Sequence, residues 1–195
     1  EFPEVVGGAE AGSEPPEEKP QEEARSSFKI IRQADGRVRF ISISCSAVLN
    51  RVGSIDSRNL FDSFREYALK TGEYPVRMFY HAGEQFRTGQ IDGLYRDEYL
   101  LITTGLYDDS ELAQREIAAR SKEPNYYGDS IGFLPTEDPE LVDIGDGVQL
   151  PIYNSGICKE VSTLPESHAA AWFTYTPTLK EVTRMLSKAQ YDEFV

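Results

Sequence analysis

Histidine, cysteine and tryptophan are scarce in this sequence of 195 residues, which has two, two and one of them. Cys45 and Cys158 alone form neither a disulfide framework nor a cysteine zinc site, which favours a reducing, intracellular compartment. Two histidines also exclude a histidine-rich metal centre. We therefore expect neither a metal nor another cofactor.

Long apolar runs and an excess of positive charge are missing as well. No stretch approaches the roughly 20 apolar residues that cross a bilayer, and no apolar segment of the signal-peptide type opens the chain. The 33 acidic and 20 basic residues give a formal net charge of -13 at pH 7. This balance argues against a nucleic-acid partner, because neutralisation of phosphates supplies that affinity. The sequence favours a soluble, acidic protein with no nucleic-acid or membrane partner.

Residues 1–27 differ in composition from the rest of the chain. They contain eight glutamates, four prolines and three glycines against only two basic residues, Lys19 and Arg25. Such a segment buries too little apolar surface to offset its ordering entropy, so we predict a disordered acidic tail. Because the chain opens on Glu1 and not on Met, we also expect a fragment, a processed product or residues added at its start.

From Phe28 onwards, alternating apolar and polar residues predict mainly β-strands. The first two are joined by a hairpin turn at Asp35-Gly36. The predicted strands cover residues 28–32, 38–48, 76–80, 86–95, 99–107, 130–134, 140–144, 148–164 and 169–175.

Helical spacing predicts a helix over 57–71, with Asp56 or Ser57 as its cap and Gly72 after its end. A second helix is predicted over 110–122 with Asp109 as its cap, and a last one from Thr178. We expect an α+β fold, mainly β, in which an antiparallel β-barrel or strongly curved sheet is flanked by helices. This domain spans 28–176 and is followed by a C-terminal helix or linker over 177–195.

The usual catalytic motifs are absent from the sequence. It has no glycine-rich phosphate loop, no paired metal-ligand pattern and no Gly-x-Ser-x-Gly motif. Three residues remain as candidates: His81 at the end of an apolar strand, Ser130 at the start of another, and Glu160 inside a third. Each also fits an ordinary structural role, and a catalytic triad is defined by geometry and not by order along the chain.

Five blocks of sequence change this interpretation when they are taken together, in order, between about Val38 and Thr176. They are Ser44-Cys45-Ser46-Ala47-Val48 with the helix start after it, Phe79-Tyr80-His81, Gln90-Ile91-Asp92-Gly93-Leu94-Tyr95, Asp129-Ser130-Ile131-Gly132-Phe133, and Lys159-Glu160-Val161-Ser162-Thr163-Leu164-Pro165. In these blocks the chain resembles the prohead (capsid maturation) serine proteases of tailed phages, a group related in fold to herpesvirus assemblin.

The resemblance implies a herpesvirus-protease-like barrel and a role for each candidate. Ser130 is implied as the nucleophile, His81 as the general base, and Glu160 as the acid that orients the imidazole. His168 is the rival third member, because the herpesvirus relatives use a second histidine there. Ser162 is expected on the same face as Glu160.

The chain departs from the family pattern at two places. Its first loop, 50–54, has fewer glycines than is common, and Asp129 precedes the serine where leucine is common. A charge at that position is expected to change the electrostatics next to Ser130.

The implied function is a serine endopeptidase that acts in the host cytoplasm, inside assembling phage proheads. Its implied partners are the scaffolding protein and the major capsid protein as substrates, together with the chain itself, and self-association is left open. The ends, 1–27 and the region after Pro177, are the expected self-processing sites. Two other functions compete: a catalytically silent assembly or scaffold module with the same fold, and a barrel that binds a small ligand.

Overall fold

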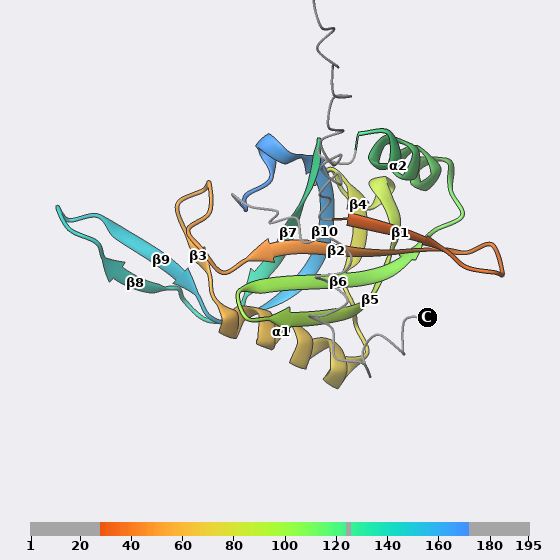
Figure 1. The fold of residues 1–195 in the computed structure, drawn as a ribbon. Helices are drawn as coiled ribbons and strands as arrows, with labels where there is room; N and C mark the ends of the chain where they lie inside the picture. Colours follow the sequence, from red (N-terminus) through yellow and green to blue (C-terminus); the bar gives the residue numbers. More distant parts are fainter. Residues whose placement is uncertain (1–27, 124–125, 172–195) are drawn as a thin grey trace, which may run out of the picture.

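The computed structural model describes residues 28–123 and 126–171, and in this part of the chain it is an α+β fold built mainly of strands (Figure 1). A seven-stranded sheet has the order β1-β2-β6-β5-β4-β10-β7, and a three-stranded sheet has the order β3-β9-β8. No described helix is both long and apolar enough to cross a membrane.

The first half of the large sheet is antiparallel and local. β1 (Phe28–Arg32) and β2 (Val38–Ser46) form the predicted hairpin, in which Gly36 adopts a φ of 86° that side chains rarely tolerate. β6 (Leu100–Tyr107) pairs with β2 and with β5 (Arg87–Asp97). The short helix η1 (Glu84–Phe86) precedes β5, so this strand begins one residue later than predicted.

The second half of the large sheet joins segments that are distant in sequence. β4 (Val76–Phe79) pairs with β5 on one side and, in parallel, with β10 (Gly156–Pro165) on the other. β7 (Tyr127–Pro135) pairs antiparallel with β10 and is the last strand in the order. β7 therefore begins three residues before the predicted strand start at Ser130.

The predicted closed barrel is not shown. Among the described residues no ladder joins β7 to β1 or β2, so the sheet stays open at that seam. The sheet is curled, however, and β7 crosses β2 (Figure 1), where the Ser42 hydroxyl donates a hydrogen bond to the Asp129 carboxylate. The strongly curved sheet is thus the better description.

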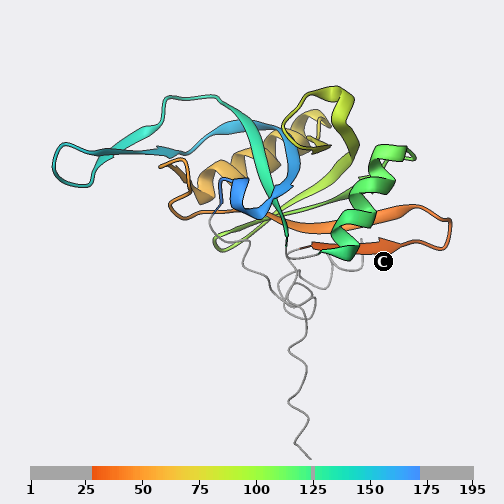
Figure 2. The same ribbon diagram turned by 90° about the horizontal axis from the view of Figure 1, so that it is seen from above.

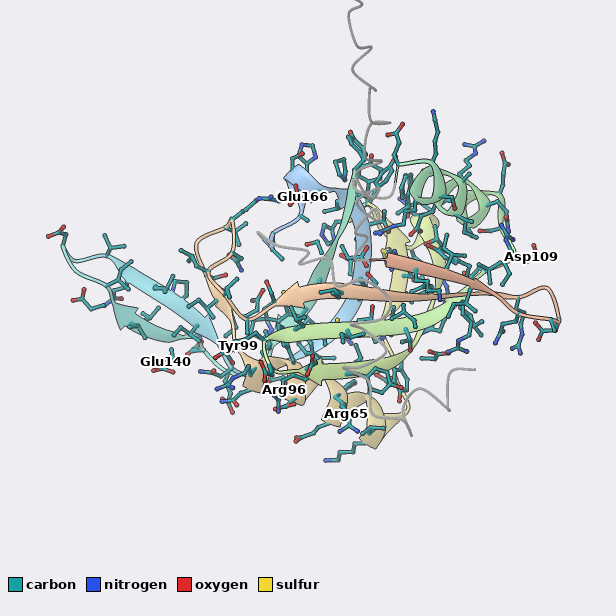
Figure 3. All side chains as sticks on the ribbon, in the orientation of Figure 1. Arg65, Arg96, Tyr99, Asp109, Glu140 and Glu166 are labelled. Atoms are coloured by element: carbon teal, nitrogen blue, oxygen red, sulfur yellow. The ribbon has the colours of Figure 1, made fainter. Side chains whose placement is uncertain are left out.

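The two described helices cover different parts of the sheet. α1 (Arg58–Thr71) packs on β5 and β10, and it starts at Ser57, whose hydroxyl accepts the Leu60 N–H. It ends at Gly72, as predicted, with a φ of 75°. In Figure 3, Arg96 of β5 lies beside α1, and its Nε donates to Asp62 Oδ1 at 2.8 Å.

The second helix, α2 (Glu111–Lys122), corrects one prediction. Its cap is Ser110, whose hydroxyl accepts the Ala113 N–H, and not Asp109. Ser110 has the extended backbone that a cap needs, whereas Asp109 lies one residue too early to reach the N–H groups of the first turn.

The hydrophobic core lies between the large sheet and the helices. Burial of each large side chain there stabilises the fold by about 1.5–3 kcal/mol. Both cysteines are buried in it as free thiols, as expected for small strand residues. Its large apolar members include Phe40, Leu60, Phe61, Phe64, Ile91, Leu94, Leu101, Ile117 and Val161.

The small sheet forms an arm that projects from the body of the protein (Figures 1 and 2). It contains β3 (Ile55–Asp56), β8 (Glu140–Asp143) and β9 (Gln149–Tyr153). The single strand predicted over 148–164 is wrong. Asn154 and Ser155 are not in a strand, and the segments before and after them, β9 and β10, belong to different sheets.

The chain after β10 also differs from the prediction. η2 (Glu166–His168) follows the strand, and residues 169–171 form no strand, although one was predicted over 169–175. The rest of that segment, the helix predicted from Thr178 and the predicted tail over 1–27 lie outside the described residues.

Candidate active site

Alternation along β7 and β10 places the candidates Ser130, Glu160 and Ser162, together with Gly132, on one face of this strand pair, which we call the outer face. Successive strand residues point to opposite sides, and Ile131 and Val161 pack into the core. Their neighbours Ser130 and Gly132 on β7, and Glu160 and Ser162 on β10, therefore lie on the side away from the core. In the register, Ser130 is opposite Ser162 and Gly132 is opposite Glu160.

A β-bulge turns Glu160 to the outer face. The register of β10 against β7 shifts between Cys158 and Glu160, which leaves Lys159 as the extra residue. In a regular strand, Cys158 and Glu160 would share a face. Because of the bulge, Cys158 is buried in the core while Glu160 faces the other side.

His81 reaches Glu160 because the chain turns sharply after β4. Tyr80 has a φ of 65°, in the left-handed region that residues other than glycine seldom adopt. Its N–H donates to the Thr163 carbonyl, and its own carbonyl accepts a hydrogen bond from Ser162 Oγ at 3.3 Å. These contacts to β10 support the strained turn and direct the next residue, His81, back over the strand.

The contact between His81 and Glu160 is short. His81 Nδ1 lies 2.5 Å from Glu160 Oε1, and the side chains are 37% and 18% exposed. A carboxylate at Nδ1 fixes the orientation of an imidazole and leaves Nε2 for another partner. The pair is therefore open to solvent on one side and supported by the strand on the other.

Gly132 makes room for the Glu160 side chain. A Cβ atom at Gly132 would lie 2.6 Å from Glu160 Oε1 and 2.7 Å from its Cγ, which is closer than real Cβ contacts. Any larger residue at this position would displace the carboxylate that contacts His81.

Ser130 lies on the same face, 5% exposed, and lines a pocket of about 440 Å³. Its hydroxyl forms no side-chain hydrogen bond with any described residue, including His81. Ser162, directly opposite, uses its hydroxyl on the Tyr80 carbonyl. Of the two serines, Ser130 is the one whose oxygen is left available.

The inner face of the same strands carries a buried charge cluster, formed by Arg77, Glu116, Arg120, Asp129 and Thr163. Arg77 donates from Nε to Glu116 Oε1 at 2.8 Å and from Nη2 to Asp129 Oδ1 at 3.2 Å. Arg120 forms a second ion pair with Asp129. Thr163 donates to Glu116 at 2.6 Å. These bonds join β4, β7, β10 and α2, so the cluster holds together the two strands that carry the outer-face residues and the strand that leads to His81.

The cluster lowers the pKa of Asp129, the residue before Ser130. Burial by itself would raise the pKa of Asp129, but Arg120 and Arg77 outweigh it and hold the pKa below its ordinary value. The expectation that this charge would change the electrostatics next to Ser130 needs correction. Asp129 points to the inner face, away from the Ser130 side chain, and two arginines balance it together with Glu116.

Sequence reasoning missed this cluster, although two signals were present. Arg77 interrupts the apolar run of β4. On α2, Glu116 and Arg120 fall on the same helical stripe as the buried Ala113 and Ile117, where charges are unusual unless they are paired.

His168, the alternative third member, lies elsewhere. It is exposed in η2, after the end of β10, and no side-chain hydrogen bond to a described residue is found for it. Figure 3 shows its neighbour Glu166 at that end of the strand. Glu160, and not His168, is the residue that the fold brings to His81.

Comparison with solved structures supports the fold, whereas comparison with families and curated proteins finds nothing. No protein-family model matches the sequence, and no curated protein is significantly similar to it. A solved structure, that of the bacteriophage T4 capsid assembly protease, is similar in fold, with a TM-score of 0.53 and 12% sequence identity. The match covers 71% of this chain and 92% of the T4 chain. At this identity the likeness establishes a phage prohead protease-like fold and nothing finer.

Proposed function

We propose that this protein is a serine endopeptidase of phage capsid maturation that uses Ser130, His81 and Glu160. The observation that carries the proposal is the 2.5 Å contact between His81 Nδ1 and Glu160 Oε1, beside Ser130 on the same sheet face. A fold similar to that of a capsid assembly protease supports the same reaction class.

The chemistry follows from the two nitrogens of His81. Glu160 accepts a hydrogen bond from Nδ1–H, so Nε2 is the free base. Nε2 removes the Ser130 proton while Oγ attacks the scissile carbonyl. Collapse of the tetrahedral intermediate breaks the C–N bond, and the imidazolium returns the proton to the leaving amine. Water then hydrolyses the acyl-enzyme by the same route.

The substrates in this proposal are capsid-assembly proteins. We assign the scaffolding protein and the removable segment of the major capsid protein, and the chain itself at its ends, 1–27 and after Pro177. The reaction takes place in the host cytoplasm inside assembling proheads. The assignment rests on the sequence resemblance and on the similarity to the T4 protease fold.

A catalytically silent assembly module with the same fold is the competing proposal. The observation that favours it is the missing hydrogen bond between Ser130 and His81 in the described chain. Catalytic hydrogen bonds are often long in substrate-free enzymes and tighten only with substrate, so a direct test of reactivity decides between the two.

The decisive experiment follows the intact mass of the full chain over time, beside Ser130→Ala and Ser162→Ala. We expect truncation in the wild type and none in Ser130→Ala. Ser162→Ala should still be truncated, but more slowly, because its hydroxyl is not the nucleophile and instead supports the turn at Tyr80 that places His81. A fluorophosphonate probe should label the wild type at Ser130. Truncation in Ser130→Ala, or a wild type that is neither truncated nor labelled, would favour the silent module.

A further inference from the structure

The pocket beside Ser130 has a size and position that suit one substrate side chain. Its volume of about 440 Å³ lies within the range of about 300–1,000 Å³ that is usual for ligand sites. It is bordered by the end of β2, the loop that leads to β3, β7, β9 and residues 170–171. Ser130 is one of its lining residues, so in the proposed protease the pocket borders the nucleophile.

The wall of this pocket formed by the loop before β3 is well ordered by hydrogen bonds. Asn50 Oδ1 accepts the backbone N–H groups of Val52 and Ser54, at 3.2 and 3.0 Å. Asn50 Nδ2 donates to Ser54 Oγ at 2.8 Å. Phe133 and Tyr153 supply apolar surface to the lining. The pocket is therefore preformed, with an apolar wall and a polar one.

Asp56 is the charged residue of this lining, and it has only weak partners. It is 5% exposed, and its Oδ2 accepts from Asn50 Nδ2 at 3.4 Å and from Cys45 Sγ at 3.5 Å. Its Oδ1 accepts no hydrogen bond from the described residues. Burial raises the pKa of Asp56, and these two neutral donors only partly oppose the effect. A buried carboxylate normally has a cationic partner.

The basic residue in the loop before β3, Arg51, forms its ion pair and hydrogen bonds with other residues. Arg51 pairs through Nη2 with Glu166 Oε1 at 2.7 Å and donates from Nη1 to the Ala169 carbonyl at 2.8 Å. No described lysine or arginine forms an ion pair with Asp56. The pocket thus holds a carboxylate without a cation, next to the proposed nucleophile.

The geometry points to Asp56 as a specificity-determining residue: the pocket takes the side chain of a lysine or arginine next to the scissile bond. The alkyl stem packs on Phe133 and Tyr153, and the cationic head reaches the Asp56 carboxylate. An acidic side chain would meet a like charge there and be rejected. This inference rests on the proposed function, because it specifies the substrate of the same site.

Binding can be measured without catalysis, in the full chain with Ser130→Ala. The probes are N-acetyl-arginine methylamide and N-acetyl-norleucine methylamide, which differ in the cationic head. We expect the arginine probe to bind on the order of tenfold more tightly. Adding Asp56→Asn should remove this preference. Adding Asp138→Asn, an exposed acid in the loop after β7, should leave it unchanged.

Equal binding of the two probes by the Ser130→Ala chain would overturn the inference, and this comparison does not depend on whether Asp56→Asn folds. Loss of the preference with Asp138→Asn as well would also overturn it, since that result indicates a general charge effect.

A second measurement uses the active chain and a set of peptides that differ only at the residues flanking the scissile bond. The ratio of cleavage rates, lysine or arginine against norleucine, should be on the order of tenfold or more and should fall with Asp56→Asn. A preference for glutamate there would overturn the inference. If no peptide is cleaved by the wild type, the proposed function fails, and the binding preference of the Ser130→Ala chain still decides the role of the pocket.

Discussion

The two faces of the β7–β10 strand pair hold polar residues of very different character. On the inner face, Asp129 and Thr163 are fully buried and bonded to both arginines of the cluster. On the outer face, His81 and Glu160 form one contact and stay partly exposed, and the Ser130 hydroxyl has no partner among the described residues.

This difference separates stability from chemistry. Each member of the inner cluster satisfies the others, so its removal leaves a buried charge unpaired. The outer residues keep unused donors and acceptors, which is what a reacting group needs. One pair of strands can therefore fix the scaffold on one side and present reactive groups on the other.

Glu160→Gln should have the largest effect, and on activity alone. A glutamine cannot stabilise the imidazolium, so we expect the rate of self-cleavage or peptide cleavage to fall by about 10⁴-fold. The pair is partly exposed, so the midpoint of urea unfolding should hardly move. Glu137→Gln, an exposed acid of the loop after β7, is the matched control. A large loss of stability in Glu160→Gln would mean that the two faces are not separable.

Asp129→Asn should have the opposite effect, with a large loss of stability. It leaves Arg77 and Arg120 without one of their carboxylates, and we expect the free energy of unfolding to fall by about 3–5 kcal/mol. Urea unfolding at neutral pH measures this value. An unchanged stability would contradict the structural role given to the inner cluster.

Lowering the pH should remove the same stabilising charge from the wild type, because it protonates Asp129. Because the folded-state pKa of Asp129 is below its ordinary value, the carboxylate stabilises the fold above about pH 4, and this contribution is lost as the pH falls through the folded-state pKa. The stability difference between wild type and Asp129→Asn should therefore shrink below about pH 4. A difference that stays constant down to pH 2 would argue against a lowered pKa.

Gly132→Ala tests whether activity depends on the close packing of Glu160 against Gly132. The added methyl group would overlap Glu160 Oε1 and displace the carboxylate from His81. We expect cleavage to slow by about 10²-fold, as is usual for a misplacement of about 1 Å. Gly145→Ala, on the distant arm, has open space around it but a φ of 105° that strains a side chain, so it is a control for activity and not for stability. Unchanged cleavage in Gly132→Ala would show that the His81–Glu160 geometry is not needed.

Asp56→Asn should have the smallest effect on stability, and it should be a gain. The pKa of Asp56 is raised by burial, so its charged form destabilises the fold at any pH above the ordinary value. Removing that charge should raise the free energy of unfolding at neutral pH by about 1 kcal/mol. A clear loss of stability would mean that the carboxylate has a structural partner, as Asp129 does.

The sequence was sufficient for the local parts of this fold. The β1–β2 hairpin follows from Asp35-Gly36, and helix α1 follows from its apolar spacing between Ser57 and Gly72. Both depend on contacts between residues that are close along the chain, which local propensity describes well.

The features of the fold that depend on contacts between distant residues could not be predicted from the sequence. The early start of β7 includes Gly128 and Asp129, which look like a turn until Arg77 and Arg120 neutralise the aspartate. The bulge at Lys159 and the left-handed Tyr80 are set by the pairing of β10 with its neighbours. His81, Ser130 and Glu160 could be named as candidates from the sequence and its family resemblance, but the orientation of each one depends on these long-range features.

The parallel pairing of β4 with β10 also determines when, during synthesis of the chain, His81 and Glu160 can come together. His81 and Glu160 are 79 residues apart, and at about 5–20 residues per second a ribosome needs on the order of 4–16 seconds to make the chain between them. Until β10 has been synthesised and docked, a nascent chain has the imidazole but not the carboxylate that orients it. In the proposed protease, this order postpones cleavage until the domain is nearly complete, so that unfinished copies do not cut the proteins being made around them.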